Sequence, residues 1–246
     1  MAMLISLTLG SLGLKEDADS YSDEAYEDMV SAQKKREAIC ILDALAQRFP
    51  GAKIELHYHV EDPWTLLVAV SLSAQTTDVA VNKVTPQLFE RFPNVQAFAK
   101  VKPEEVEPYI KTLGFFRNKA KNLVKAAQAI TERFQGQIPK AREDLETIPG
   151  VGAKSAAVII ANAFGVPAIA VDTHVMRVSK RLGLTKHTDP SKIEKDLTHL
   201  LPLDRLIDAH HTFIWHGRRI CFARKPLCSE CPVNDRCPRI GVKVSA

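Results

Sequence analysis

The sequence lacks an uncharged stretch long enough to cross a membrane. Its longest uncharged run, from Ser155 to Val171, has seventeen residues and contains glycine, proline and asparagine, whereas a spanning helix needs about 20 apolar residues. The apolar first fourteen residues contain no Lys or Arg and lead into acids instead of a small-residue cleavage site, so they do not match a signal peptide. We therefore expect a cytoplasmic protein that has no membrane partner.

Alternation of apolar and polar residues, the pattern of a half-buried strand, is also nearly absent. Apolar residues recur instead at helical spacing, for example at Ile39, Leu42, Leu45 and Phe49. On this basis helices are expected over 32–49, 63–75, 79–92 and 123–134, from Ala153 onward, and after Asp172, with Asp78 as the cap of the third. The sequence therefore predicts an all-α fold with short connections, no internal repeat and no low-complexity linker.

Charge is unevenly distributed along the chain. The 246 residues carry a formal net charge of +4 and a sequence pI near 8.7. Residues 1–28 hold seven acids and only one lysine, and removing that net −6 leaves +10 on the remainder. We expect residues 1–30 to form an acidic, disordered tail. The basic remainder favours a polyanionic partner, although charge alone does not identify it.

Four of the five cysteines are concentrated in one short segment, CFARKPLCSECPVNDRC, with the spacing C-x6-C-x2-C-x5-C. Four thiolates this close along the chain can converge on one metal centre. Zinc sites with four cysteines more often pair two well-separated C-x2-C units, and disulfides are rare inside cells. Zinc, two disulfides and an iron-sulfur cluster all remain open on spacing alone. The fifth cysteine, Cys40, is expected to be a small core residue of its helix.

The segment IPGVG, residues 148–152, predicts a tight turn between two helices, because glycine allows backbone angles that a Cβ forbids. The amides that open the second helix would point outward with the positive end of the helix dipole, which suits a phosphate. An ordinary helix-turn-helix corner is the alternative. Lys154 follows the turn at once, and Asp172 stands eighteen residues later, beyond an apolar helix.

LETIPGVGAKSAAVIIANAFGVPAIAVDTHVMRV, which contains this turn, resembles the helix-hairpin-helix region of the endonuclease III family of base-excision DNA glycosylases. The similarity extends upstream to LLVAVSLSAQTTDVAVNK and downstream to the cysteines, over about residues 35–240. It implies a nucleoid-associated monomer that removes oxidised pyrimidines from duplex DNA and cleaves the abasic site. The implied 4Fe-4S cluster is structural, with Cys221, Cys228, Cys231 and Cys237 as its ligands.

The resemblance assigns Lys154 as the nucleophile and Asp172 as the catalytic carboxylate. An amine can displace a base at C1′, and the resulting Schiff base acidifies the C2′ proton, so that the 3′ phosphate leaves by β-elimination. A lysine must be neutral to attack, which costs roughly 4 to 5 kcal/mol at pH 7 for an ordinary side chain, so its surroundings must help. Asp172 would stabilise developing positive charge or relay protons. A phosphate contact for Lys154 and simple N-capping by Asp172 are the alternatives.

The remaining site residues are assigned to DNA contacts. Chemistry at C1′ requires the nucleotide to leave the duplex, and side chains should fill the vacancy. The resemblance gives this role to Gln75 and Phe115, although the family more often has leucine or another aliphatic residue at the second position. Otherwise Gln75 satisfies loop amides and Phe115 is core. The further expected contacts, to the DNA backbone or the opposite strand, are Gly150, Val151, Gly152, His174, Arg177, Arg224 and Lys225.

We thus expect two helical lobes with DNA across the cleft between them: a central bundle over 56–166, and a cluster lobe of 31–55 plus 167–246. One alternative is a monofunctional adenine or mismatch glycosylase, but the adenine enzyme lacks the nucleophilic lysine and carries a further C-terminal domain, whereas this chain stops nine residues after Cys237. A second alternative is a non-catalytic helix-hairpin-helix protein that binds DNA without a covalent intermediate.

Overall fold

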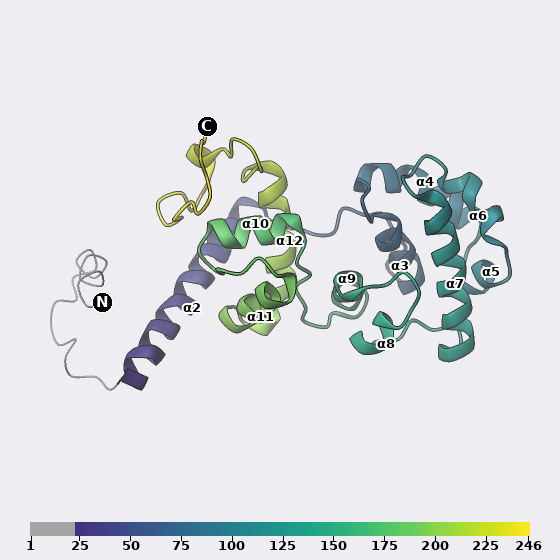
Figure 1. Ribbon diagram of the computed structural model, residues 1–246, viewed down its shortest axis with the longest axis horizontal. Coiled ribbons are helices and arrows are strands. Elements are labelled where there is room, and N and C mark those ends of the chain that lie inside the picture. The colour runs from purple at the N-terminus through teal and green to yellow at the C-terminus, as the bar shows by residue number, and fades with distance from the viewer. Residues whose placement is uncertain (1–22) are drawn as a thin grey trace.

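The computed structural model describes residues 23–246, with side chains from Ser31 onward, and that part of the chain is helical without strands (Figure 1). The predicted all-α fold is therefore confirmed. The helices are α2 (Asp23–Arg48), α3 (Pro63–Leu72), α4 (Asp78–Arg91), α5 (Val95–Ala99), α6 (Pro103–Ile110), α7 (Phe116–Phe134), α8 (Arg142–Glu146), α9 (Ala153–Phe164), α10 (Thr173–Arg181), α11 (Pro190–Leu200) and α12 (Leu206–Arg219). Short 3-10 helices lie at Leu203–Arg205 and Cys228–Glu230.

The first described helix, α2, is longer than the sequence pattern predicted. It begins at Asp23, so residues 23–30, which were assigned to the tail, are helical. Acidic residues are frequent in this part of the sequence, and negative charge is favourable in the first turns of a helix. The rest of the predicted acidic tail, residues 1–22, lies outside the described residues.

Asp62 caps helix α3 by accepting a hydrogen bond from the Trp64 amide, and the helix ends at Leu72. It stops short of the predicted 63–75 because the chain then turns, with Gln75 in the left-handed region at φ 53°. The cap of α4 is Thr77, not Asp78 as predicted. Thr77 has the extended backbone that a cap requires, while Asp78 is already the first helical residue. The Asp78 carboxylate therefore does not cap α4 and can form a contact with another part of the chain.

The larger of two hydrophobic cores, which we call the large core, is built from α3 to α9. Helix α7 packs against α5 and α6, and α3 packs against α9. Leu67, Phe98 and Leu123 are fully or almost fully buried at its centre. These helices form one half of the molecule in Figure 1.

The second core, the small core, joins α2 to α10, α11 and α12 and extends to the C-terminal cysteines. Three of the four residues of the predicted stripe, Leu42, Leu45 and Phe49, are buried, whereas Ile39 is only partly buried. Ala38 and Ile41 complete the buried face of α2, so that Ala38, Ile41, Leu42 and Leu45 make the i, i+3, i+4, i+7 pattern. Cys40 lies away from this face and is exposed, so its prediction as a core residue is wrong. We propose that the two cores correspond to the two lobes predicted from the sequence.

The chain passes between the cores twice, before α3 and between α9 and α10. In the second passage successive side chains are buried on opposite sides: Ala168 and Ala170 belong to the large core, Ile169 and Val171 to the small core. This alternation is what extended backbone produces, and it ties the passage into both cores just before Asp172. No helix within residues 23–246 is long and apolar enough to span a membrane.

Candidate active site

A cavity of about 180 Å³ between the two cores is lined by both Lys154 and Asp172. Lys154 comes from the first turn of α9 in the large core, and Asp172 directly precedes α10 in the small core. The two residues that the sequence separates by an apolar helix therefore face one space. A larger cavity, of about 630 Å³, lies between α2, α11 and the segment after α10.

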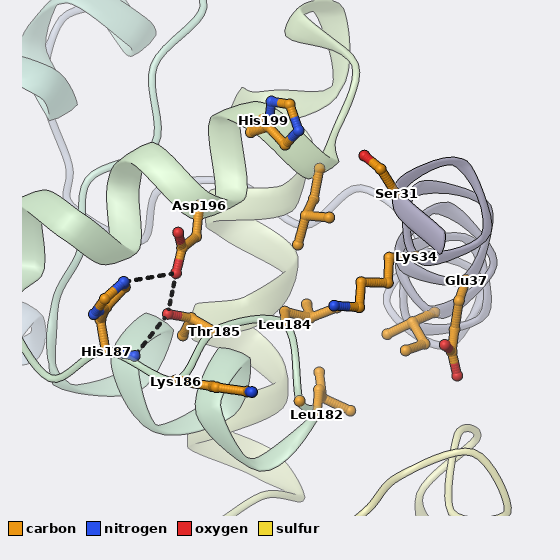
Figure 2. Close-up of a pocket in the computed structure, with 13 residues that line it drawn as sticks. Ser31, Lys34, Glu37, Leu182, Leu184, Thr185, Lys186, His187, Asp196 and His199 are labelled. Atoms are coloured by element: carbon orange, nitrogen blue, oxygen red, sulfur yellow. Dashed lines mark hydrogen bonds and ion pairs between the residues drawn. The ribbon is translucent and has the colours of Figure 1, made fainter. Parts of the chain in front are cut away.

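That larger cavity contains none of the predicted site residues (Figure 2). Its polar groups are partly occupied with one another, since the Thr185 hydroxyl donates to Asp196 Oδ2 at 2.5 Å and accepts from the His187 amide at 3.1 Å. We therefore place the candidate active site in the smaller cavity, where Lys154 and Asp172 are brought together from different cores.

The Gly150–Gly152 turn fixes the start of α9. Gly150 has φ +83°, and a Cβ there would lie 3.0 Å from Asn122 Cβ, so both backbone angle and space require glycine. Val151 is buried in the large core and its amide donates to the Ile148 carbonyl, so its side chain holds the turn in place. Gly152 caps α9 without a side chain, which leaves the first amides of the helix uncapped beside the exposed Lys154.

Asp172 caps α10 through one carboxylate oxygen. Oδ1 accepts hydrogen bonds from the amides of His174 and Val175, both at 2.8 Å. Among the hydrogen bonds of the described residues, none involves Oδ2. Asp172 is therefore an N-cap, as the alternative predicted. Capping does not exclude a catalytic role, because Oδ1 fixes the position of the carboxylate while Oδ2 stays available to a substrate in the cavity.

Two buried histidines of α12, His210 and His211, also line the cavity. Burial, together with the neighbouring His211, lowers the pKa of His210 to about 3. Burial likewise lowers the pKa of His211 to about 4, and this ring hydrogen-bonds Asn162 Oδ1 of α9 at 3.0 Å. Both rings are therefore neutral near pH 7 and add no positive charge beside Lys154. The sequence shows the two histidines as neighbours, but nothing in it places them at this cavity.

A group of charged side chains closes another wall of the cavity. Arg218 of α12 forms ion pairs with Glu55 and Asp78, and Arg219 pairs with Glu55 at 2.6 Å. Burial alone would raise the pKa of Glu55, but the hydrogen bonds from Arg219 and Arg218 outweigh it and lower this pKa below its ordinary value. This group was not identified from the sequence.

Gln75 and Phe115 are both exposed and both adopt left-handed backbone conformations, with φ 53° and 58°. Phe115 is 65% exposed, so the alternative that it belongs to the core is excluded. Gln75 directly follows Ala74, which lines the cavity. Large side chains held out on strained backbone suit insertion into a partner, and their role in filling a vacated base position stays a prediction.

His174 and Arg177, predicted as DNA contacts, are half-buried between α10 and α12. Arg177 donates through Nε to the Cys221 carbonyl at 3.0 Å and through Nη2 to the Gly217 carbonyl at 2.8 Å. A Cβ on Gly217 would lie 3.0 Å from His174 Cβ, so the close approach of the helices requires glycine there. The structure thus uses Arg177 to hold the cysteine segment, and a DNA contact by either residue stays a prediction.

The four C-terminal cysteines surround one small cavity at the end of the small core and form no disulfide. Burial raises the pKa of the Cys231 thiol to about 11, and the other three cysteines add to this rise. Burial also raises the pKa of the Cys237 thiol. Four converging sulfurs, two of them in thiols that resist ionisation by themselves, fit a positively charged metal centre, which deprotonates the sulfurs that bind it. The donor set therefore fits the predicted cluster.

Arg181, at the end of α10, supports this centre. Its guanidinium donates to Cys221 Sγ at 3.3 Å, to the Phe222 carbonyl at 2.6 Å and to the Ala223 carbonyl at 3.0 Å. Hydrogen bonds to sulfur and to the backbone of a ligand segment fix the first sulfur in place. Arg224 and Lys225 follow in the same segment and are exposed, as contacts to phosphates would require.

Replacement of Cys228 by serine is expected to yield colourless, poorly soluble protein, because a missing thiolate leaves the segment from 221 to 237 without one of its four attachments. Visible absorption and iron content of the purified variant measure the effect. Cys40→Ser is the matched control, since Cys40 is exposed on α2 and is expected to leave both quantities unchanged. Full iron content in Cys228→Ser would remove this residue from the ligand set.

Comparison with known proteins supports the predicted family. Residues 68–203 match the HhH-GPD superfamily of base excision DNA repair proteins. The endonuclease III of Synechocystis sp. (strain PCC 6803) is 50% identical over 208 residues, which cover 84% of this chain and 94% of that protein. The endonuclease III of Bacillus subtilis (strain 168) is 45% identical over 197 residues, which cover 80% and 89%.

A solved structure of a trapped endonuclease III–DNA covalent intermediate matches with a TM-score of 0.79 and 43% sequence identity, covering 83% of this chain and 96% of that one. Residues 221–237 match the iron-sulfur binding domain of endonuclease III, which confirms the predicted iron-sulfur site. Over most of its length, therefore, the chain belongs to the endonuclease III family of helix-hairpin-helix base excision DNA repair proteins.

Proposed function

We propose that this protein is a bifunctional DNA glycosylase and AP lyase, which removes oxidised pyrimidines from duplex DNA and then cleaves the abasic site by β-elimination. The observation that carries the proposal is the shared cavity of Lys154 and Asp172. A phosphate contact alone would not require a lysine to line the same cavity as a carboxylate fixed by two amides. A 4Fe-4S cluster on the four cysteines would hold the C-terminal segment in place.

The chemistry follows from the positions of these two groups. Neutral Lys154 Nζ attacks C1′ of the extruded nucleotide, the bond from C1′ to the base breaks, and the base leaves with the bonding electrons and takes up a proton. Asp172 Oδ2 stabilises the positive charge that develops on the sugar as this bond lengthens. The attached nitrogen then gives up one of its two protons, and the ring oxygen O4′ takes up a proton as the C1′–O4′ bond breaks, which leaves a protonated, cationic Schiff base.

The Schiff base then permits strand cleavage. Removal of a proton from C2′ and departure of the 3′ phosphate break the C3′–O bond, and water later hydrolyses the Schiff base to restore Lys154. The neutral His210 and His211 help at this stage in one respect: they add no charge that would compete with the cationic Schiff base for the Asp172 carboxylate.

The proposed DNA contacts surround the cavity. The uncapped amides at the start of α9 would bind one phosphate, and the exposed Gln75 and Phe115 would occupy the space of the extruded nucleotide. Arg224 and Lys225 would meet phosphates beside the cluster. We propose that the protein acts on DNA as a monomer in the cytoplasm, associated with the nucleoid.

Borohydride trapping on duplex DNA with one thymine glycol tests the proposal. We expect a covalent complex, because borohydride reduces the Schiff base that forms only after the base has been removed. An abasic duplex is run in parallel. Trapping on abasic DNA alone would leave a lyase with another base substrate, and absence of trapping on both duplexes, with iron content intact, would contradict the proposed function.

A further inference from the structure

The two groups of the proposed reaction belong to different cores, so their separation depends on how the cores are joined. Lys154 moves with α9 and the large core, and Asp172 moves with α10 and the small core. Helix α12, which belongs to the small core, forms a wall of the cavity between them. Polar contacts from α12 to the large core are therefore candidates for setting this separation.

Arg218 makes the main contact of this kind beside the cavity. Its Nη1 donates to Asp78 Oδ2 at 2.7 Å and also to Glu55 Oε2. Asp78 opens α4, a helix of the large core, and Glu55 lies in the first passage between the cores. Only 32% of the Arg218 side chain and 19% of the Asp78 side chain are exposed, so solvent screens this ion pair incompletely.

The segment that carries Glu55 is held from both sides. The Glu55 carbonyl accepts from Asn82 Nδ2 of α4 at 2.8 Å, and Asn82 Oδ1 accepts from the His57 amide at the same distance. From the other side, Trp215 Nε1 of α12 donates to the Lys53 carbonyl at 2.9 Å. The passage is thus attached to α4 and α12 at once.

Removal of the Arg218 charge would leave the Glu55 and Asp78 carboxylates close together without the cation that separates them. Like charges in a partly buried site repel each other, and the repulsion would act across the boundary between the cores. Arg218 itself is 140 residues from Asp78 in the sequence, so this contact joins elements that no local interaction connects.

We propose that Arg218 is a positioning residue for the active site: its ion pairs with Asp78 and Glu55 hold α12 against the large core, and thereby keep Lys154 and Asp172 at the separation that the reaction needs. This proposal rests on the proposed function. Arg218 acts through the placement of the two cores and not by contact with the reacting atoms.

The test compares Arg218→Gln, Arg218→Lys and wild type in single-turnover borohydride trapping on an abasic duplex at saturating protein. We expect Arg218→Gln to slow trapping about 10- to 100-fold, the range that a misplacement near 1 Å produces. Arg218→Lys, which restores the cation, is expected to recover most of the rate. The dissociation constant for an undamaged duplex is expected to stay close to the wild-type value, because the Arg218 guanidinium already forms ion pairs with two carboxylates of the protein and does not bind DNA.

Arg142→Gln is the matched control. Arg142 of α8 also joins the two cores, through a bidentate ion pair with Glu194 of α11, and its side chain is 30% exposed, but it lies outside the cavity. We expect this variant to trap at the wild-type rate. Asp78→Asn removes the charge from the opposite side of the contact and is expected to slow trapping in the same way, should Arg218→Gln fail to fold.

Four outcomes would overturn the proposal. Normal trapping by Arg218→Gln and Asp78→Asn would exclude a positioning role, and equal slowing by Arg142→Gln would assign the effect to general attachment of the cores. Weakened DNA binding with an unchanged saturated rate would make Arg218 a DNA contact. Failure of the wild type to trap would contradict the proposed function itself, a result distinct from failure of the variants alone.

Discussion

Lys154→Ala is expected to abolish borohydride trapping and strand cleavage on abasic DNA, with a loss of at least about 1,000-fold, because no other group can form the Schiff base from that position. The fold should change little, since the Lys154 side chain is exposed in the first turn of α9 and contributes nothing to the large core. Gel quantification of the trapped complex gives the rate, and circular dichroism with thermal unfolding gives the stability.

Lys53→Ala is the matched control for this variant. Lys53 also lines the cavity, but its structural contact is the backbone carbonyl that accepts from Trp215, which the substitution preserves. It is expected to trap normally. If Lys154→Ala trapped at the wild-type rate and Lys53→Ala did not, the nucleophile would have to be reassigned to Lys53.

Asp172→Asn and Asp172→Ala are expected to lower base removal from thymine glycol DNA about 100-fold or more, because both remove the charge that stabilises the developing cation. The two variants should differ in stability. Asparagine can still accept from the His174 and Val175 amides, whereas alanine loses the cap of α10 and should cost about 1 kcal/mol more in the free energy of unfolding. Single-turnover base release and chemical denaturation measure the two effects separately.

This pair of variants tests whether one carboxylate has two functions. High activity in Asp172→Asn together with low activity in Asp172→Ala would show that only the cap matters and that the charge takes no part. Equal, low activity with unequal stability is the expected pattern, and it corresponds to capping by Oδ1 and chemistry at Oδ2.

The sequence predicts those parts of the site that depend on local motifs. The Gly150–Gly152 turn, the cap at Asp172 and the four cysteines are recognised by spacing over a few residues. Contacts between distant segments are not predicted. Arg218 pairs with Asp78 because two cores pack against each other, and no periodicity within α12 indicates which helix will face it.

Errors at helix boundaries have a similar origin. Asp78 and Thr77 are both good caps, and the choice between them follows from the backbone of the preceding turn, which includes Gln75 at positive φ. Cys40 was expected in the core only because cysteine is a small apolar residue, but the buried face of α2 runs through Ala38, Ile41, Leu42 and Leu45 and leaves Cys40 exposed. A shift of one residue on a helix rotates a side chain by about 100°, enough to exchange core and surface.

Helix α10 connects the proposed catalytic carboxylate to the cysteine segment. Asp172 caps its beginning, and Arg177 and Arg181 from its later turns hold Cys221 and the two residues after it. Nine helical residues span about 13 Å, so a disturbance at the cysteines reaches the carboxylate through one rigid element. We therefore expect base removal by this protein to depend on an intact cysteine centre, and not only on the two groups that line the cavity. Loss of the cluster would be felt unequally by the two groups: Lys154 lies on α9 of the large core, whereas Asp172 depends on α10, which the cysteine segment contacts.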